Sequence, residues 1–339
     1  MRRLVRPRSA RRSRRVAALA AVLVGSLAGC SLAFGESAAP PSPMAALTVG
    51  APQPQGPRDL EAYAGLGTWV DVFDFVDRYA GDPPPLSGAD ADAMADRGVR
   101  TVFVQATRWD DQSPDGIVDR AGLRSFLVNA HRRGMRVVGW YLPHLGDLDR
   151  DLERVRQILD FEASGHRFDG IGIDIEWTDG VEDVEERNDR LVDLSRRIDE
   201  LAGDVPVAAI VLPAVQIEVV NPRYWPSFPY RDLAPYYDVW MPMAYWTFRD
   251  EPYGDGGAFV TESVDRLRAN LGDPDAMVAP IGGIGDLVTE RDVTLFAESL
   301  AQVGAIGGSY YDWATLSEER REQIAASFAD GPAADLPRP

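Results

Sequence analysis

The 339-residue chain contains no lysine, one cysteine and only three histidines. A single cysteine excludes a disulfide within the chain, and so few Cys and His residues exclude a metal cluster built from them. No Gly-x-Gly-x-x-Gly motif follows the first predicted strand, which leaves a dinucleotide-binding function without support. We therefore expect no metal and no cofactor.

Positive charge is scarce outside the N-terminus. The formal net charge is −18, and removing the eight Arg residues of the first 29 positions, which contain no acid, takes it to −26. Such an acidic body cannot neutralise phosphates, so nucleic acid is excluded as a partner. A hydrophobic content of 45% with 26% charged residues is typical of a folded domain.

The N-terminus has the features of an export signal. Residues 2–15 are strongly basic, and residues 16–27 form an apolar run too short for a transmembrane helix. The run ends at Leu27-Ala28-Gly29-Cys30, which resembles the box that precedes the lipidated cysteine of bacterial lipoproteins. We predict a signal peptide over residues 1–29 and a lipid on Cys30. The lipid would anchor the exported protein to the extracytoplasmic face of the cell membrane.

Two alternatives for this segment stay open. Cys30 could follow an ordinary signal peptide by chance, and Ser13-Arg14-Arg15 is compatible with twin-arginine export. Residues 30–60 are rich in Pro and Ala and predict a tether, and residues 330–339 predict a disordered tail. The domain itself is expected over residues 61–329.

Short β-rich runs alternate with amphipathic helical stretches eight times along the domain. Strand–helix alternation predicts a parallel sheet, and eight units in one domain predict a (β/α)₈ TIM barrel. A doubly wound open sheet is the alternative. The predicted strands are Thr68–Phe73, Thr101–Gln105, Arg136–Leu142, Gly170–Trp177, Val207–Leu212, Val239–Tyr245, Met277–Ile281 and Gly307–Trp313.

The fourth predicted strand contains two acids. Side chains alternate along a strand, so Gly172, Asp174 and Glu176 share the face that would point into the barrel. Two carboxylates this close raise one pKa, which suits a general acid at neutral pH. Barrel active sites lie at the C-terminal ends of the strands, where this pair falls. The alternative is a pair of satisfied polar residues at a strand end.

This strand resembles the D-G-x-D-x-D-x-E signature of the family 18 glycoside hydrolases, the chitinase-like barrels. Asp169, Gly170, Asp174 and Glu176 match, whereas Gly172 stands in place of the middle Asp. The Ser-x-Gly-Gly motif of the family's third strand is absent. The chain therefore resembles a distant relative of the family.

Two further motifs extend the resemblance. Met243 and Tyr245 match the Met-x-Tyr-Asp motif that ends the family's sixth strand, and Trp246 replaces its Asp. Trp313 ends the eighth predicted strand, where the family places a tryptophan under the sugar.

The resemblance implies a retaining, substrate-assisted mechanism. Glu176 would protonate the leaving glycosidic oxygen, and the 2-acetamido group of the sugar would attack, oriented by Asp174 and Tyr245. Because the middle Asp is missing, we expect Asp174 to stay ionised more readily than in the family. An ordinary retaining or inverting pair that uses Asp71 or Asp312 stays open.

Aromatic and polar residues at the predicted strand ends suit a sugar site, because pyranose faces stack on aromatic rings. Trp140 could instead belong to the barrel core, and Asp71 could cap a strand end. The predicted substrate-binding residues are Trp313, Met243, Trp246, Asp71, Trp140 and Gln105.

Two classes of function follow. The first is an exported, membrane-tethered glycosidase that acts on an N-acetylated glycan, and the second is a catalytically silent barrel that binds carbohydrate. The presence of Glu176 favours the enzyme, whereas Gly172 and the altered sixth strand favour the binding protein. In both cases we expect a monomer whose partners are a carbohydrate and, through the lipid alone, the membrane.

Overall fold

The computed structural model describes residues 57–81, 83–113, 115–337 and 339. The predicted signal peptide, Cys30 and most of the predicted tether lie outside the described residues. Among the described helices, none is long and apolar enough to cross a membrane.

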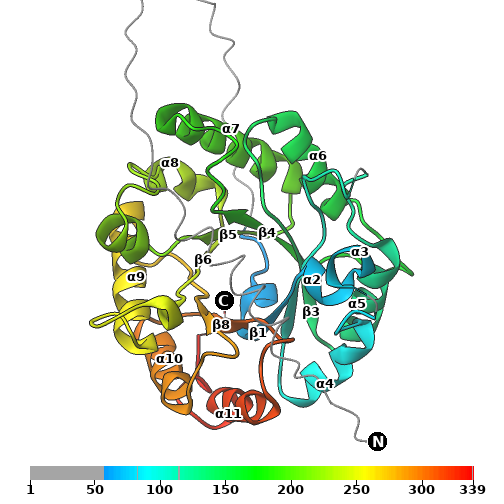
Figure 1. The fold of residues 1–339 in the computed structure, drawn as a ribbon, viewed down its shortest axis with the longest axis vertical. Helices are drawn as coiled ribbons and strands as arrows, with labels where there is room; N and C mark the ends of the chain where they lie inside the picture. Colours follow the sequence, from blue (N-terminus) through cyan, green and yellow to red (C-terminus); the bar gives the residue numbers. More distant parts are fainter. Residues whose placement is uncertain (1–56, 82, 114, 338) are drawn as a thin grey trace, which may run out of the picture. The chain divides into compact units, whose positions relative to one another are not determined.

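The core of the domain is a sheet of eight parallel strands inside a ring of helices (Figure 1). The strand order is β6-β5-β4-β3-β2-β1-β8-β7. Single parallel bridges from Trp240 to Val278 and from Met243 to Ile281 link β6 to the segment around β7, so the barrel is nearly closed. The predicted TIM barrel is therefore confirmed. The strands are β1 (Gly65–Val70), β2 (Thr101–Gln105), β3 (Arg136–Tyr141), β4 (Gly170–Ile175), β5 (Val207–Val211), β6 (Val239–Pro242), β7 (Ile281–Ile284) and β8 (Gly307–Tyr311).

Most of the long helices begin at a side chain that accepts a backbone N–H, as Asp119, Asp183 and Thr289 do. The connections from β1 to β2 and from β5 to β6 differ, because they contain only short helical elements. The helical elements are η1 (Glu61–Tyr63), α2 (Val72–Phe75), α3 (Asp77–Ala80), η2 (Gly88–Asp90), α4 (Ala91–Asp96), α5 (Arg120–Arg132), α6 (Leu148–Leu159), α7 (Val184–Ala202), η3 (Gln216–Val220), α8 (Tyr230–Leu233), η4 (Ala234–Tyr236), η5 (Trp246–Phe248), α9 (Gly256–Leu271), α10 (Glu290–Gln302) and α11 (Glu318–Ala329).

Only β2 has its predicted bounds among the eight strands. Five strands (β3, β4, β5, β6 and β8) begin as predicted and end one to three residues earlier, whereas β1 and β7 are shifted along the chain. β1 ends at Val70, because the side chain of Asp71 accepts the N–H of Phe73 at 2.7 Å and starts α2. β7 begins at Ile281, where the predicted strand ended. The consequence for the site is that Asp71 is a helix cap at the end of β1 and not a strand residue.

Aromatic side chains fill the barrel interior. The Trp69 ring stacks on Phe103 with centroids 4.5 Å apart, and its centroid lies 5.9 Å from that of Trp140. The Tyr63 hydroxyl donates to the carbonyls of Ile171 and Pro206, both at 2.9 Å. The lower part of the barrel is therefore packed core, and a ligand site must lie above it.

Both ends of the described chain pack on the barrel. The guanidinium of Arg58 is 2.8 Å from Asp199 and 3.0 Å from Asp238. At the other end, Ala333 is buried and its N–H donates to the carbonyl of Ser327. Packing therefore extends beyond residues 61–329 on both sides, into the last residues of the predicted tether and the first residues of the predicted tail.

Candidate active site

The strand β4 directs two carboxylates to the upper end of the barrel interior. A Cβ atom at Gly172 would lie 2.9 Å from Ile210 Cδ1 and 3.3 Å from Trp140 Cβ, so this face of β4 points inward. Asp174 and Glu176 follow on the same face by strand alternation. A side chain at position 172 would therefore require Ile210 or Trp140 to shift.

Tyr245, which follows β6, shares a site with these acids. Burial raises the pKa of Tyr245 well above its usual value, and the charges of Glu176, Asp174, Asp312 and Asp71 raise it further. The charges of Asp174 and Glu176 thus act on the Tyr245 phenol, which connects the three predicted catalytic residues electrostatically.

Burial controls the ionisation of the β4 pair. It raises the pKa of Glu176 to about 7, and burial together with the charge of Glu176 raises the pKa of Asp174. Asp174 is 8% exposed, and its Oδ1 atom has no hydrogen-bond partner among the described residues. Burial therefore favours the protonated form of Asp174, and the expected difference from the family stays a prediction.

A second group of acids lies at the ends of β1 and β8. Asp71, Asp74 and Asp312 are buried, and each places one carboxylate oxygen within 4.8 Å of the others, so these residues could approach a cation. Their oxygens already accept hydrogen bonds. Asp71 accepts from Phe73 N and the hydroxyl of Tyr311, Asp74 from Asp71 N at 3.1 Å, and Asp312 from the N–H of Thr315 at 2.8 Å. The group therefore has a structural explanation as caps and turns.

Gln105, Trp140 and Met243 are buried at the ends of β2, β3 and β6. Gln105 is 4% exposed, and its Oε1 accepts the N–H of Val72, so it positions the start of α2. Trp140 has a buried Nε1 atom without a hydrogen-bond partner in the described part of the chain. Met243 lies after β6 and bridges to Ile281. Among these three residues, Trp140 therefore has an Nε1–H donor that a ligand could pair.

The structure does not bring Trp246 to the site. This residue begins η5, where strand alternation stops, and its ring packs 5.4 Å from Phe296 of α10. It is 1% exposed and belongs to the core between the barrel and the helices, so the prediction of sugar contact is wrong for Trp246.

Trp313 is also covered, since the Arg321 guanidinium lies 4.2 Å from its ring centroid. The interior residue at the end of β8 is instead Tyr311, whose ring lies 6.2 Å from that of Tyr245. Sequence reasoning missed Tyr311, although strand alternation places it on the same face as Trp313.

Aromatic residues line the rim next to Glu176. The rings of Trp109 and His144 stack with centroids 3.9 Å apart, and Trp177 lies 6.3 Å from His144. The guanidinium of Arg150 lies 4.1 Å from the Trp109 ring centroid. The connections after β2, β3 and β4 thus form one continuous wall.

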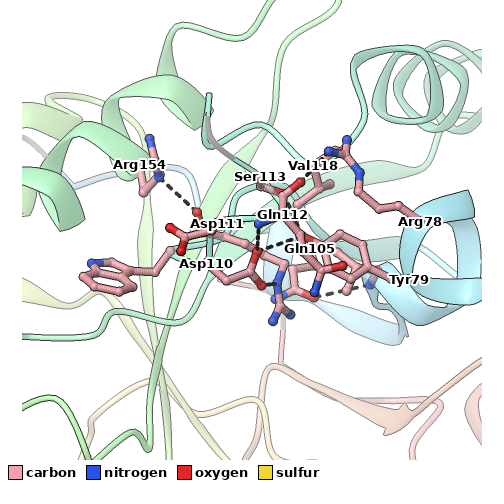
Figure 2. A network of polar contacts seen from close by, with 12 residues as sticks. Arg78, Tyr79, Gln105, Asp110, Asp111, Gln112, Ser113, Val118 and Arg154 are labelled. Atoms are coloured by element: carbon pink, nitrogen blue, oxygen red, sulfur yellow. Dashed lines mark hydrogen bonds and ion pairs between the residues drawn. The ribbon is translucent and has the colours of Figure 1, made fainter.

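Figure 2 shows the polar network that fixes the connection after β2. The Tyr79 hydroxyl donates to Asp110 at 2.9 Å, and Arg154 Nε donates to the carbonyl of Arg108 at 3.0 Å. Arg78 donates to the carbonyl of Gln112 at 2.6 Å. This connection is therefore held from both α3 and α6, which gives the rim a defined shape.

Comparison with known proteins supports the fold. No family model matches the chain, and no curated protein matches it in sequence. Among solved structures, a GH18 chitinase from Cycas revoluta in complex with (GlcNAc)4 aligns over 78% of this chain and 99% of its own, with TM-score 0.57 and 9% identity. An endo-beta-1,4-mannanase from Thermotoga petrophila aligns over 80% and 78%, with TM-score 0.58 and 10% identity.

A third similar structure is a chitinase-like agglutinin from Robinia pseudoacacia. It covers 77% of this chain and 98% of its own, with TM-score 0.56 and 10% identity. These proteins share the barrel, although their names describe two different hydrolases and an agglutinin. At such identities the likeness establishes the fold, and the function has to be argued from the site.

Proposed function

We propose that this protein is a glycoside hydrolase that acts on an N-acetylated glycan, with Glu176 as the general acid. The observation that carries the proposal is the inward-facing Asp174–Glu176 pair beside Tyr245, in which burial raises the pKa of Glu176 to about 7. A carboxyl group with such a pKa is partly protonated at neutral pH and can donate its proton.

The remaining groups suit an acetamido nucleophile. Asp174 Oδ1, buried and unpartnered among the described residues, would accept the amide N–H of the sugar. Tyr245 stays protonated because its pKa is raised, so its hydroxyl would donate to the acetamido oxygen. As that oxygen attacks the anomeric carbon, Glu176 gives its proton to the departing glycosidic oxygen. Water then attacks the anomeric carbon, gives its proton to the Glu176 carboxylate and breaks the bond to the acetamido oxygen, so the configuration is retained and the acid is restored.

An ordinary pair of carboxylates is less well supported. Both oxygens of Asp71 accept hydrogen bonds, from Phe73 N and from the Tyr311 hydroxyl, and Asp312 Oδ1 accepts the N–H of Thr315. Asp174 offers an unpartnered oxygen, which favours substrate assistance over nucleophilic attack by Asp71 or Asp312.

A catalytically silent carbohydrate-binding barrel is the second candidate. It is favoured by Gly172 in place of the middle Asp and by the agglutinin among the similar structures. Calorimetric binding and product analysis on the same N-acetylated oligosaccharides separate the two, because only the enzyme turns the ligand over.

The test of the proposal is hydrolysis of N-acetylated oligosaccharides by the wild type, with mannan oligosaccharides as the control substrate. We expect products of retained anomeric configuration by proton NMR. We also expect inhibition by a thiazoline sugar, whose ring mimics the cyclic intermediate. Inverted products, or retention without thiazoline inhibition, would reject substrate assistance. Binding without any hydrolysis would replace the enzyme by the binding protein.

We further propose that the enzyme is exported and lipid-anchored through Cys30. The support is the sequence around Leu27-Ala28-Gly29-Cys30, since the thiol is the group that receives the lipid. Detergent partitioning of wild type and Cys30→Ser, both expressed with the full leader, tests the anchor. The wild type is expected in the detergent phase and the variant in the aqueous phase, whereas partition of both into one phase would reject it.

A further inference from the structure

The irregular connection between β5 and β6 touches the segment that carries Glu176. Glu176 lies just beyond β4, whose pairing with β5 ends at Ile175 and Val211. The hydroxyl of Tyr224, from the irregular connection, donates to the backbone carbonyl of Glu176 at 3.0 Å. Burial and the charge of Glu176 raise the pKa of Tyr224 to about 12, so its hydroxyl remains a donor at neutral pH.

A buried arginine holds the other end of the same segment. Arg187 of α7 is 3% exposed, and its NH1 atom donates to the carbonyl of Val181 at 2.9 Å and to that of Thr178 at 3.4 Å. Its guanidinium lies 4.5 Å from the ring centroid of Trp225. Residues 176–181 are thus held at Glu176 by Tyr224 and at Val181 by Arg187.

Burial of the Arg187 guanidinium costs more free energy than a purely structural contact would require. Burial lowers the pKa of Arg187, and the charges of Tyr224 and Asp183 offset this effect only in part. Burying a charge that is only partly compensated costs free energy. Trp225 is 1% exposed, and its Nε1 donates to Asn188 at 2.8 Å, so the ring under Arg187 is itself fixed.

We propose that Tyr224 and Arg187 are positioning residues that hold Glu176 in place as the proton donor. This inference rests on the proposed function, because it concerns the geometry of the same acid. The irregular connection between β5 and β6 thereby supports the active site. Neither residue is required to touch the substrate.

Loss of the Tyr224 hydroxyl should affect the acid in two ways. The segment after β4 would lose its hydrogen bond, and displacement of a reacting group by about 1 Å costs up to ~10²-fold in rate. Water would also reach the Glu176 carboxyl more easily, so its pKa would fall toward the ordinary value of 4.5. A general acid works only when protonated, so the basic limb of the pH profile would move to lower pH.

The test compares Tyr224→Phe with Tyr237→Phe. Tyr237 belongs to the same connection, is also buried and makes a 2.8 Å hydrogen bond to Ser195 Oγ, away from Glu176. We expect Tyr224→Phe to lower kcat by roughly 10–10²-fold with little change in KM. We also expect the basic limb of the pH–rate profile of Tyr224→Phe to shift to lower pH by at least about half a pH unit. Tyr237→Phe should keep the wild-type kcat and pH profile, with a similar loss of thermal stability.

A readout that needs no turnover separates this inference from the proposed function. The carboxyl resonance of Glu176 in ¹³C-glutamate-labelled protein, assigned with Glu176→Gln, reports its titration directly. A lower titration midpoint in Tyr224→Phe than in wild type and Tyr237→Phe supports positioning, even if the wild type hydrolyses nothing. An unchanged midpoint, or equal kinetics of the two Phe variants, overturns it. Absence of hydrolysis in the wild type overturns only the proposed function.

Discussion

Carboxyl groups lie at both ends of the segment around β4, and their pKa values shift in opposite directions. Asp169, just before the strand, accepts hydrogen bonds from His131 Nε2 and Val137 N, both at 2.8 Å, and from Arg136 at 3.1 Å. Burial alone would raise the pKa of Asp169, but these partners outweigh it and lower that pKa. At the far end, burial raises the pKa values of Asp174 and Glu176.

The difference separates a stabilising carboxylate from catalytic ones within the eight residues from Asp169 to Glu176. A carboxylate with partners stabilises the folded state, as is usual at the N-terminal face of a barrel. Carboxyl groups that are buried without such partners destabilise it when ionised, and they are typical of catalytic positions. Three variants and one pH titration test this difference between Asp169 and the Asp174–Glu176 pair.

The largest effect is expected for Glu176→Gln. The amide keeps the shape but cannot donate the proton, so turnover should fall by ~10²–10⁴-fold, the usual contribution of a positioned acid. Initial rates on an N-acetylated oligosaccharide measure this fall. Substrates with good leaving groups need less protonation and should lose less. Equal rates for the variant and the wild type would remove Glu176 from the mechanism.

A smaller loss is expected for Asp174→Asn. The positive charge that develops on the cyclic intermediate favours the ionised form of Asp174. The substitution removes this charge, an electrostatic effect worth ~10²–10³-fold in turnover. Affinity for a thiazoline sugar, measured by calorimetry, should fall with it. Near-normal turnover in Asp174→Asn would mean that the acetamido group needs no carboxylate.

The smallest effect on activity, with the clearest effect on stability, is expected for Asp169→Asn. Losing charge-assisted hydrogen bonds to His131, Val137 and Arg136 should lower the free energy of unfolding by about 1.5–3 kcal/mol. Denaturant unfolding measures this loss, and turnover per folded molecule should stay at the wild-type level. Asp92→Asn, which removes an exposed ion pair with Arg132 and Arg133, is the control and should change little. A large loss of turnover in folded Asp169→Asn would contradict the division of roles.

Strand periodicity predicted the barrel and the inward face of β4, because both depend on local alternation that a parallel sheet preserves. It failed where alternation stops. Trp246 lies in a helical turn after β6, and β1 ends early because Asp71 caps α2. Those side-chain directions depend on turn geometry, which periodicity does not contain.

Other features depend on contacts between distant parts of the chain. The Tyr311–Asp71 hydrogen bond joins residues 240 positions apart, and the Tyr224–Glu176 bond spans 48 positions. Burial raises the pKa of Asp174, and the motif shows the missing Asp but not this burial. Burial is a property of the whole barrel and could not be read from the eight residues of the motif.

The most direct test of the contrast is the unfolding free energy of wild type, Glu176→Gln and Asp169→Asn as a function of pH. A raised folded-state pKa stabilises below the unfolded value of about 4.5, and this stabilisation is lost as pH rises through about 7. The wild type should therefore lose stability relative to Glu176→Gln over that range, by about 1.4 kcal/mol for each unit of pKa shift.

For Asp169 the sign is reversed. Its lowered pKa stabilises the protein above the unfolded value of 3.8, so the advantage of wild type over Asp169→Asn should shrink as pH falls below it. Opposite slopes for the two variants are the predicted result. Parallel curves for wild type and Glu176→Gln between pH 4.5 and 7 would contradict the account, because Glu176 would then titrate alike in the folded and unfolded chain.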